Sequence, residues 1–221
     1  MISAAFKALQ DLLSPEFRGI LIKALGLTLL LFVGVFVAVE IIINSLSLVP
    51  WAWAEDLIAV VAGLGLLVAF FFLAAPVTAM FAGLFLDRVA GFVEKRHYPR
   101  DPPGVDLPMR QAIVFALQFA AIILLVNLAI LPVVFFGIGA IGFIIANAYL
   151  LSREYFEMAA MRYMDIEDAK EFRRINSPQV FVSGFIPALL ALVPIVNLVV
   201  PLFSTSYFMH ILKQMRRRSS A

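Results

Sequence analysis

The stretch "LIAVVAGLGLLVAFFFLAAPVTAMFAGLFL", residues 57–86, has no charged side chain at any of its 30 positions. A helix of that length measures ~45 Å, which exceeds the ~30 Å hydrocarbon core of a bilayer. The stretch therefore predicts a transmembrane helix that tilts or protrudes, with Pro76 as a candidate kink. Charged and apolar residues alternate beyond it as far as Arg96. We expect this second transmembrane helix to cover residues 54–96 and to end in a cytoplasmic stalk.

A second long apolar run precedes this one. Residues 24–39 carry no charge, and the run predicts a first transmembrane helix over residues 15–46. Ser14, Pro15 and Glu16 predict where that helix begins. A hydroxyl N-cap, a proline at the first helical position and an acid in the first turn all favour a helix start.

Residues 1–13 carry a shorter amphipathic pattern. Phe6 and Leu9 fall on one helical face, while Lys7 and Asp11 lie away from that face. The pattern predicts a short interfacial helix at the membrane surface.

The basic residues predict the topology. All 17 lysines and arginines fall in four segments of the chain, and none lies between Lys23 and Arg88. Because loops rich in lysine and arginine stay in the cytoplasm, we expect both termini there and the loop between the two long helices outside.

Two further apolar stretches, residues 111–152 and 178–212, each begin and end on the cytoplasmic side and therefore predict hairpins. The first has 42 residues, or ~63 Å of helix, which barely allows two crossings of a ~30 Å core. The second is strongly apolar only over residues 180–203, and three prolines divide that part. We expect partly inserted, re-entrant hairpins, joined by a cytoplasmic connector helix over residues 153–174.

The fold class that follows is an all-α integral membrane protein, organised as one membrane domain over residues 1–221. It would have two long transmembrane helices, two partly inserted hairpins and an amphipathic N-terminal helix.

Composition excludes several functions. The chain has no cysteine and only two histidines, and the neighbourhoods of His97 and His210 lack carboxylates at ligand spacing. We therefore expect no metal site, and no sequence motif indicates a cofactor. The membrane runs lack the paired groups of a catalytic site, so we expect no enzyme. A formal net charge of +2 does not predict nucleic-acid binding.

A few polar residues are candidates for handling a solute. Arg18 and Lys23 lie in the first turns of the first long helix, where the positive helix end favours an anion. Anchoring to anionic lipid is the alternative role for both. Asn127 and Asn197 interrupt apolar runs, and each either lines a solute path or forms an interhelical hydrogen bond.

Three segments resemble one known family. They are "SPEFRGILIKALGLTLLLF" from Ser14, "SREYFEMAAMRY" from Ser152 and "PIVNLVVPLFSTSYFMHILK" from Pro194. The chain resembles the CysZ sulfate permeases and the related etoposide-induced membrane proteins of eukaryotes. The resemblance implies sulfate uptake across a bacterial inner membrane for cysteine biosynthesis. It also implies two long membrane helices with two partly inserted hairpins.

The sulfate-binding motif of that family is a glycine-leucine-arginine run, usually followed by a second arginine. It would fall on Glu16, Phe17, Arg18 and Gly19, where only Arg18 matches. The resemblance thus implies that Arg18 recruits sulfate.

We expect a homo-oligomer, a dimer or larger, because two spans can hardly enclose a hydrated path. The alternative is a non-transport scaffold or regulatory protein that binds partners through residues 153–174.

Overall fold

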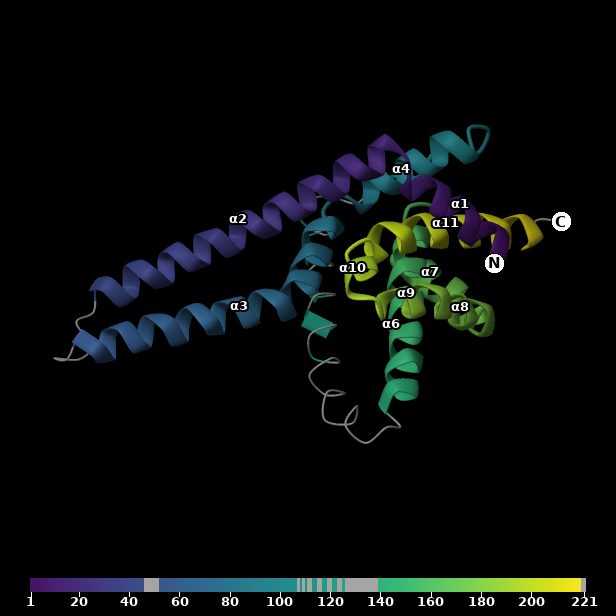
Figure 1. The fold of residues 1–221 in the computed structure, drawn as a ribbon. Coiled ribbons are helices and arrows are strands. Elements are labelled where there is room, and N and C mark those ends of the chain that lie inside the picture. Colours follow the sequence, from purple (N-terminus) through teal and green to yellow (C-terminus); the bar gives the residue numbers. More distant parts are fainter. Residues whose placement is uncertain are drawn as a thin grey trace.

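The computed structural model describes residues 1–45, 52–106 and 139–219, together with isolated residues between 108 and 125. Every secondary-structure element assigned within these ranges is a helix. Two long helices project from a body of shorter ones (Figure 1). The expectation of an all-α protein is therefore confirmed.

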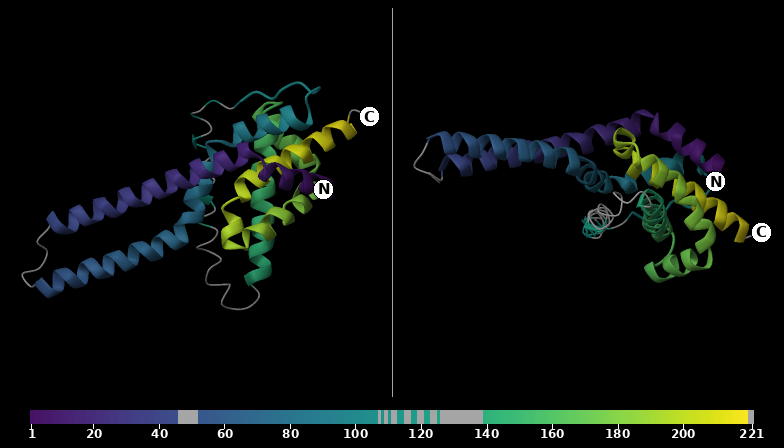
Figure 2. Two further views of the ribbon diagram at one scale, coloured as in Figure 1. Left: turned by 45° about the horizontal axis from the view of Figure 1, so that its top comes forward. Right: turned by 60° about the horizontal axis from the view of Figure 1, so that its bottom comes forward.

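The projecting arm consists of α2 (Pro15–Ser45) and α3 (Ala52–Gly83), which run antiparallel side by side (Figures 1 and 2). Their 31 and 32 residues correspond to ~46 and ~48 Å. A hydrogen bond between Thr28 Oγ1 and Thr78 Oγ1, 3.0 Å long, joins them. Because the Thr28 hydroxyl donates its proton to Ala24 O at 2.9 Å, the Thr78 hydroxyl is the donor in this bond.

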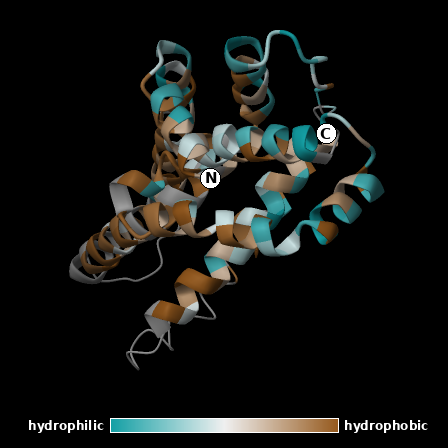
Figure 3. Cartoon of the chain, turned by 90° about the vertical axis from the view of Figure 1, so that its right-hand side faces the viewer, coloured by the Kyte–Doolittle hydropathy of each residue, from teal (hydrophilic) through white to brown (hydrophobic). Residues whose placement is uncertain are grey.

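The surface of the arm is apolar and exposed. In the described ranges, Pro15–Ile42 is long and apolar enough to cross a membrane, and only 6% of its most apolar window is buried. The core helix of a soluble protein would be mostly buried. Figure 3 shows hydrophobic residues along the arm and hydrophilic ones concentrated on the body. An exposed apolar surface of this length is what a lipid-embedded helix presents.

The body is organised around the C-terminal helix α11 (Val200–Ser219). Every residue from Val200 to Lys213 is buried, and α11 packs against helices from both ends of the chain. The other helices of the body are α1 (Ile2–Leu12), α4 (Leu86–His97), α6 (Gly139–Met161), α7 (Ile166–Ile175), α8 (Ser177–Ser183), α9 (Phe185–Ala191) and α10 (Pro194–Asn197).

The expected second helix, residues 54–96, is two helices in the structure. α3 bends in its later part (Figure 1) and ends at Gly83, and α4 begins at Leu86. α4 is not a free stalk: its buried residues Leu86, Val89, Ala90 and Val93 form one helical stripe, and the helix packs against α11. Burial of that stripe explains why the chain changes direction here.

The stretch expected as the second hairpin, residues 178–212, contains two arms. α8 and α9 form the first arm, α10 lies at the turn, and α11 forms the return. Pro178 and Pro194 occupy first-turn positions of α8 and α10, where a proline replaces a backbone donor that has no helical partner.

Two other expected segments remain: the connector is not one helix in the structure, and the first hairpin lies largely outside the described residues. The expected connector, residues 153–174, is split between the end of α6 and α7, with a turn from Arg162 to Asp165. Much of the first expected hairpin, residues 111–152, lies outside the described residues, and so does Asn127. Its later part is α6.

Candidate functional site at the start of α2

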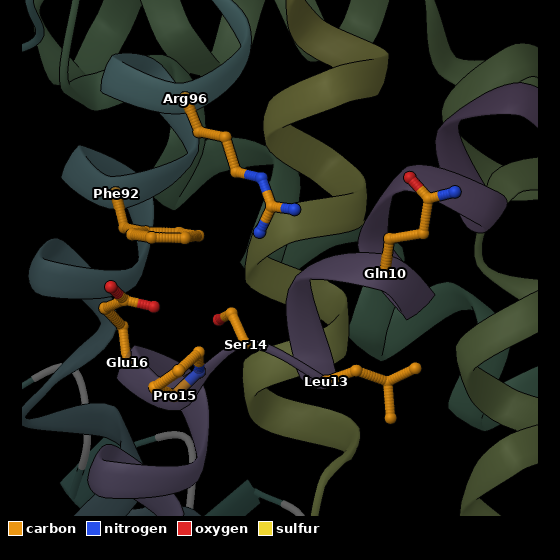
Figure 4. Close-up of a pocket in the computed structure, with 7 residues that line it drawn as sticks. All are labelled: Gln10, Leu13, Ser14, Pro15, Glu16, Phe92 and Arg96. Carbon is orange, nitrogen blue, oxygen red and sulfur yellow. The ribbon is translucent and has the colours of Figure 1, made fainter.

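An open pocket of about 620 Å³ lies where α1 passes into α2 and faces α4 (Figure 4). The end of α1 and the first turn of α2 form one wall, and α4 forms the other. The lining residues are Gln10, Leu13, Ser14, Pro15, Glu16, Phe92 and Arg96.

The first turn of α2 is fixed by local chemistry. Pro15 has no N–H, and the N–H of Phe17 donates to Ser14 Oγ at 3.4 Å. This bond confirms Ser14 as the N-cap. The Phe17 side chain is buried and meets Phe92 edge-on with ring centroids 5.6 Å apart. Phe17 therefore attaches α2 to α4 and does not present its side chain to a solute.

Charges of both signs face the pocket. The Arg96 side chain extends toward it from α4, and the carboxylate of Glu16 lies on the α2 side (Figure 4). An anion here would be attracted by the Arg96 guanidinium and the positive end of α2, and repelled by Glu16. Arg96 was not a candidate from the sequence, because its neighbours on α4 read as a solvated stalk.

The other expected anion residues lie outside this pocket. Arg18 and Lys23 are exposed on α2. They are five positions apart, so their side chains point ~140° apart and lie ~7.5 Å apart along the helix. They do not form one clamp. Gly19 has open space around it, and Asn197 ends α10, partly buried.

The orientation of α1 turns Asp11 toward the body. Asp11 is fully buried together with Ala4 and Ala8, while Phe6 and Leu9 are exposed. The small residues allow α1 to pack closely on α11, and the carboxylate lies between the two helices rather than in water. The large apolar side chains of α1 are left free to contact lipid.

Polar side chains from α4 and α11 surround Asp11. His97 Nε2 lies 2.9 Å from Asp11 Oδ1, and the Ser206 hydroxyl donates to Asp11 Oδ2 at 2.7 Å. His210 Nε2 lies 3.5 Å from Oδ2. Burial opposes ionisation of Asp11, but the neighbouring His210, His97 and Ser206 side chains outweigh it and hold its pKa below the usual value. Arg96 adds an ion pair at 3.6 Å.

The phenol of Tyr98 completes this group. Its oxygen lies 2.7 Å from His210 Nδ1, and burial raises the pKa of Tyr98 to about 12. Burial also lowers the pKa of His210, whose imidazole is therefore neutral at physiological pH.

A separate buried cation is fully countered by acids. Arg162 binds Glu94 through Nε at 3.0 Å and Nη2 at 3.3 Å, and its Nη1 reaches Asp87 and Asp106 at 2.6 and 2.9 Å. Tyr163 also donates to Glu94, at 2.6 Å. Three carboxylates around one guanidinium leave no positive charge for a solute anion, so this cluster joins α4 to the end of α6.

Sequence reasoning missed Asp11 together with His97 and His210 as a group. Asp11 and His97 are 86 positions apart, and no local spacing connects them. The one available signal was an ionisable residue, His210, inside an apolar helix, since such a position favours a function.

Comparison with known proteins gives one family. The family model described as "Sulfate transporter CysZ/Etoposide-induced protein 2.4" matches residues 4–201 of the chain. No match to a curated protein was found.

Proposed function

Because this chain belongs to the Sulfate transporter CysZ/Etoposide-induced protein 2.4 family, we propose that it carries sulfate across the bacterial inner membrane for cysteine biosynthesis. Membership implies a sulfate-transporter-like function, and the family is one of membrane transporters rather than of enzymes. Uptake of sulfate itself, rather than of a related oxyanion, is the proposal.

The observation that carries this proposal is the exposed α2–α3 arm. Its helices are long enough to cross a bilayer, and the most apolar part of α2 is almost entirely unburied. Two helices side by side enclose no water-filled path, so we propose that a homo-oligomer, a dimer or larger, forms the route. Contacts between copies would cover part of the apolar surface, and lipid would cover the rest.

We further propose that sulfate enters from the end of the arm that adjoins the body. Arg18 is exposed at the start of α2, and in the described part of the chain no ion pair engages it. Lys23 adds a second exposed cation further along the helix, on a different face, and Arg96 faces the neighbouring pocket. Asn197, and Asn127 outside the described residues, would line the later part of the route.

The same arrangement supports a cytoplasmic location for both termini. The body carries Arg216, Arg217 and Arg218 at the end of α11, whereas residues 46–56, the stretch of sequence that connects α2 to the start of α3, have no lysine or arginine. The exposed apolar side chains of α1 would rest on the inner surface of the membrane.

The test is uptake of radiolabelled sulfate into liposomes that contain the purified protein, with chloride and phosphate as competitors. We expect saturable uptake. Arg18→Ala should lower sulfate affinity by about tenfold or more, because a hydrogen bond to a charged group contributes about 1.5–3 kcal/mol. Arg174→Ala is the matched control, since that arginine is exposed on α7 and pairs with Glu171 at 2.9 Å.

The possible results separate the two proposals. Unchanged affinity and uptake in Arg18→Ala would remove Arg18 from the route but leave the transport function standing. Absence of saturable flux in well-reconstituted vesicles would refute transport itself. The scaffold alternative gains no support from α7, where Lys170 and Arg174 pair with acids of the same helix.

A further inference from the structure

The only two histidines of the chain meet in the folded protein. His97 lies at the end of α4 and His210 in α11, yet their ring centroids are 4.8 Å apart. The carboxylate of Asp11, from α1, lies beside both rings, near one nitrogen of each. One ligand atom from each of the three residues can be chosen so that all lie within 4.8 Å of one another.

We propose that Asp11, His97 and His210 bind a divalent transition-metal ion of the zinc class. Two imidazole nitrogens and one carboxylate oxygen are the donor set that such ions take in proteins. Ca²⁺ and Mg²⁺ do not fit this set, because both require several oxygen ligands. Three protein ligands leave a fourth position of a tetrahedral ion open.

An unsatisfied buried atom points to the same ligand. His210 is fully buried, and in the described ranges its Nε2 has no hydrogen-bond partner. Buried polar atoms in proteins are nearly always satisfied. Nε2 faces Asp11 Oδ2 at 3.5 Å, so an ion held by the carboxylate would satisfy it.

The surrounding side chains hold the ligands in the orientation that a metal needs. The Tyr98 oxygen lies 2.7 Å from His210 Nδ1. In the tautomer whose Nδ1–H donates this hydrogen bond to the Tyr98 oxygen, the Nε2 lone pair is free for an ion. Ser206 donates to Asp11 Oδ2 at 2.7 Å and restrains the carboxylate. Outer contacts of this kind orient metal ligands and raise their basicity.

Binding would draw the ligand atoms closer together. Ligand atoms of a tetrahedral zinc ion lie about 3.3 Å apart. His97 Nε2 lies 2.9 Å from Asp11 Oδ1 and His210 Nε2 lies 3.5 Å from Asp11 Oδ2, while one ligand atom from each residue falls within 4.8 Å of the other two. Arg96 competes for Asp11 Oδ1 at 3.6 Å. Its side chain is exposed and can turn into solvent, although its charge and that of nearby Lys7 weaken cation binding.

Occupancy would link three segments that are distant in the sequence. The ion would join α1, α4 and α11, and Asp11 lies only three residues before the N-cap of α2. A bound metal would therefore fix the body against the start of the proposed membrane arm.

The experiment measures Zn²⁺ binding, independently of sulfate flux. Protein purified in detergent with a tag that lacks histidine is stripped with a chelator and titrated calorimetrically with Zn²⁺. Co²⁺ then serves as a spectroscopic probe of tetrahedral coordination. We expect one equivalent per chain, and Tyr98→Phe should weaken binding about 10–100-fold.

Two variants and one control make the site assignment falsifiable. His97→Gln keeps a hydrogen-bond donor toward Asp11, but it should abolish stoichiometric Zn²⁺ binding, and His97→Ala should do the same. The helical circular dichroism spectrum should be retained at least in His97→Gln. Glu171→Gln, which removes an exposed acid of α7, should bind like the unaltered protein. Absence of stoichiometric Zn²⁺ binding to the unaltered protein, or equal binding by His97→Gln, would overturn the proposal.

Discussion

Replacement of Arg162 by methionine should strongly destabilise the body, because it removes the cation that three acids share. The guanidinium side chain is 3% exposed. Its partners differ in burial: the side chain of Glu94 is 8% exposed, that of Asp87 24% and that of Asp106 74%. Loss of Arg162 therefore leaves one carboxylate buried without its cation, while the other two can be hydrated.

The size of the effect follows from that one carboxylate. Removal of one partner from a buried ion pair costs about 3–5 kcal/mol. Tyr163 and the Gly104 N–H still donate to Glu94, which places the expected loss near the lower end, about 3 kcal/mol. Asp106→Asn, at the exposed end of the same cluster, should cost less than about 1 kcal/mol.

The assay is chemical unfolding in detergent, followed by far-UV circular dichroism. Arg162→Met combined with Glu94→Met should recover much of the lost stability, because an apolar pair replaces a buried ion pair at little cost. The reasoning fails if Arg162→Met loses no more stability than Asp106→Asn, or if the double variant is less stable than Arg162→Met alone.

Two further predictions concern the same body. Burial opposes ionisation of Glu94, but Arg162 and Tyr163 outweigh it and hold its pKa below the usual 4.5. The stability that Glu94 contributes is therefore complete above pH 4.5 and is lost as the pH falls through the lowered pKa of this carboxylate. Unfolding midpoints measured as a function of pH should show this loss of stability, and the Glu94→Gln variant should not show it. Gly184→Ala should destabilise by about 1–3 kcal/mol, because the new Cβ would overlap the Ala148 carbonyl oxygen. Gly91→Ala, on α4 in open space, should instead stabilise by about 0.5–1 kcal/mol; equal effects in thermal melts would contradict the packing argument.

Some features of the fold could be predicted because their causes are local. The start of α2 follows from Ser14 and Pro15, whose hydrogen-bonding roles depend only on the next few residues. The long helices follow from charge-free runs, since an apolar stretch of membrane length has few alternatives to a helix. The resemblance to the sulfate transporter family came from such local segments too, and the family match agrees with it.

Other features depended on packing that no local pattern contains. The sequence marks α4 as amphipathic, but only the presence of α11 beside it explains why the chain turns between Gly83 and Leu86. Arg18 could be proposed from the sequence, whereas Arg96 reaches the neighbouring pocket because Phe17 and Phe92 hold α2 against α4.

The all-helical class, the two long apolar helices and the family could be predicted from the sequence, because each depends on the composition and periodicity of short segments. The tertiary structure alone decided that Asp11 lies inside the protein and that His97 and His210 meet beside it. The periodicity of apolar residues assigns each residue to one side of its own helix, but it does not predict which other helix covers that side. The partner of α1 is α11, nearly two hundred positions away, and only folding of the whole body brings their side chains together.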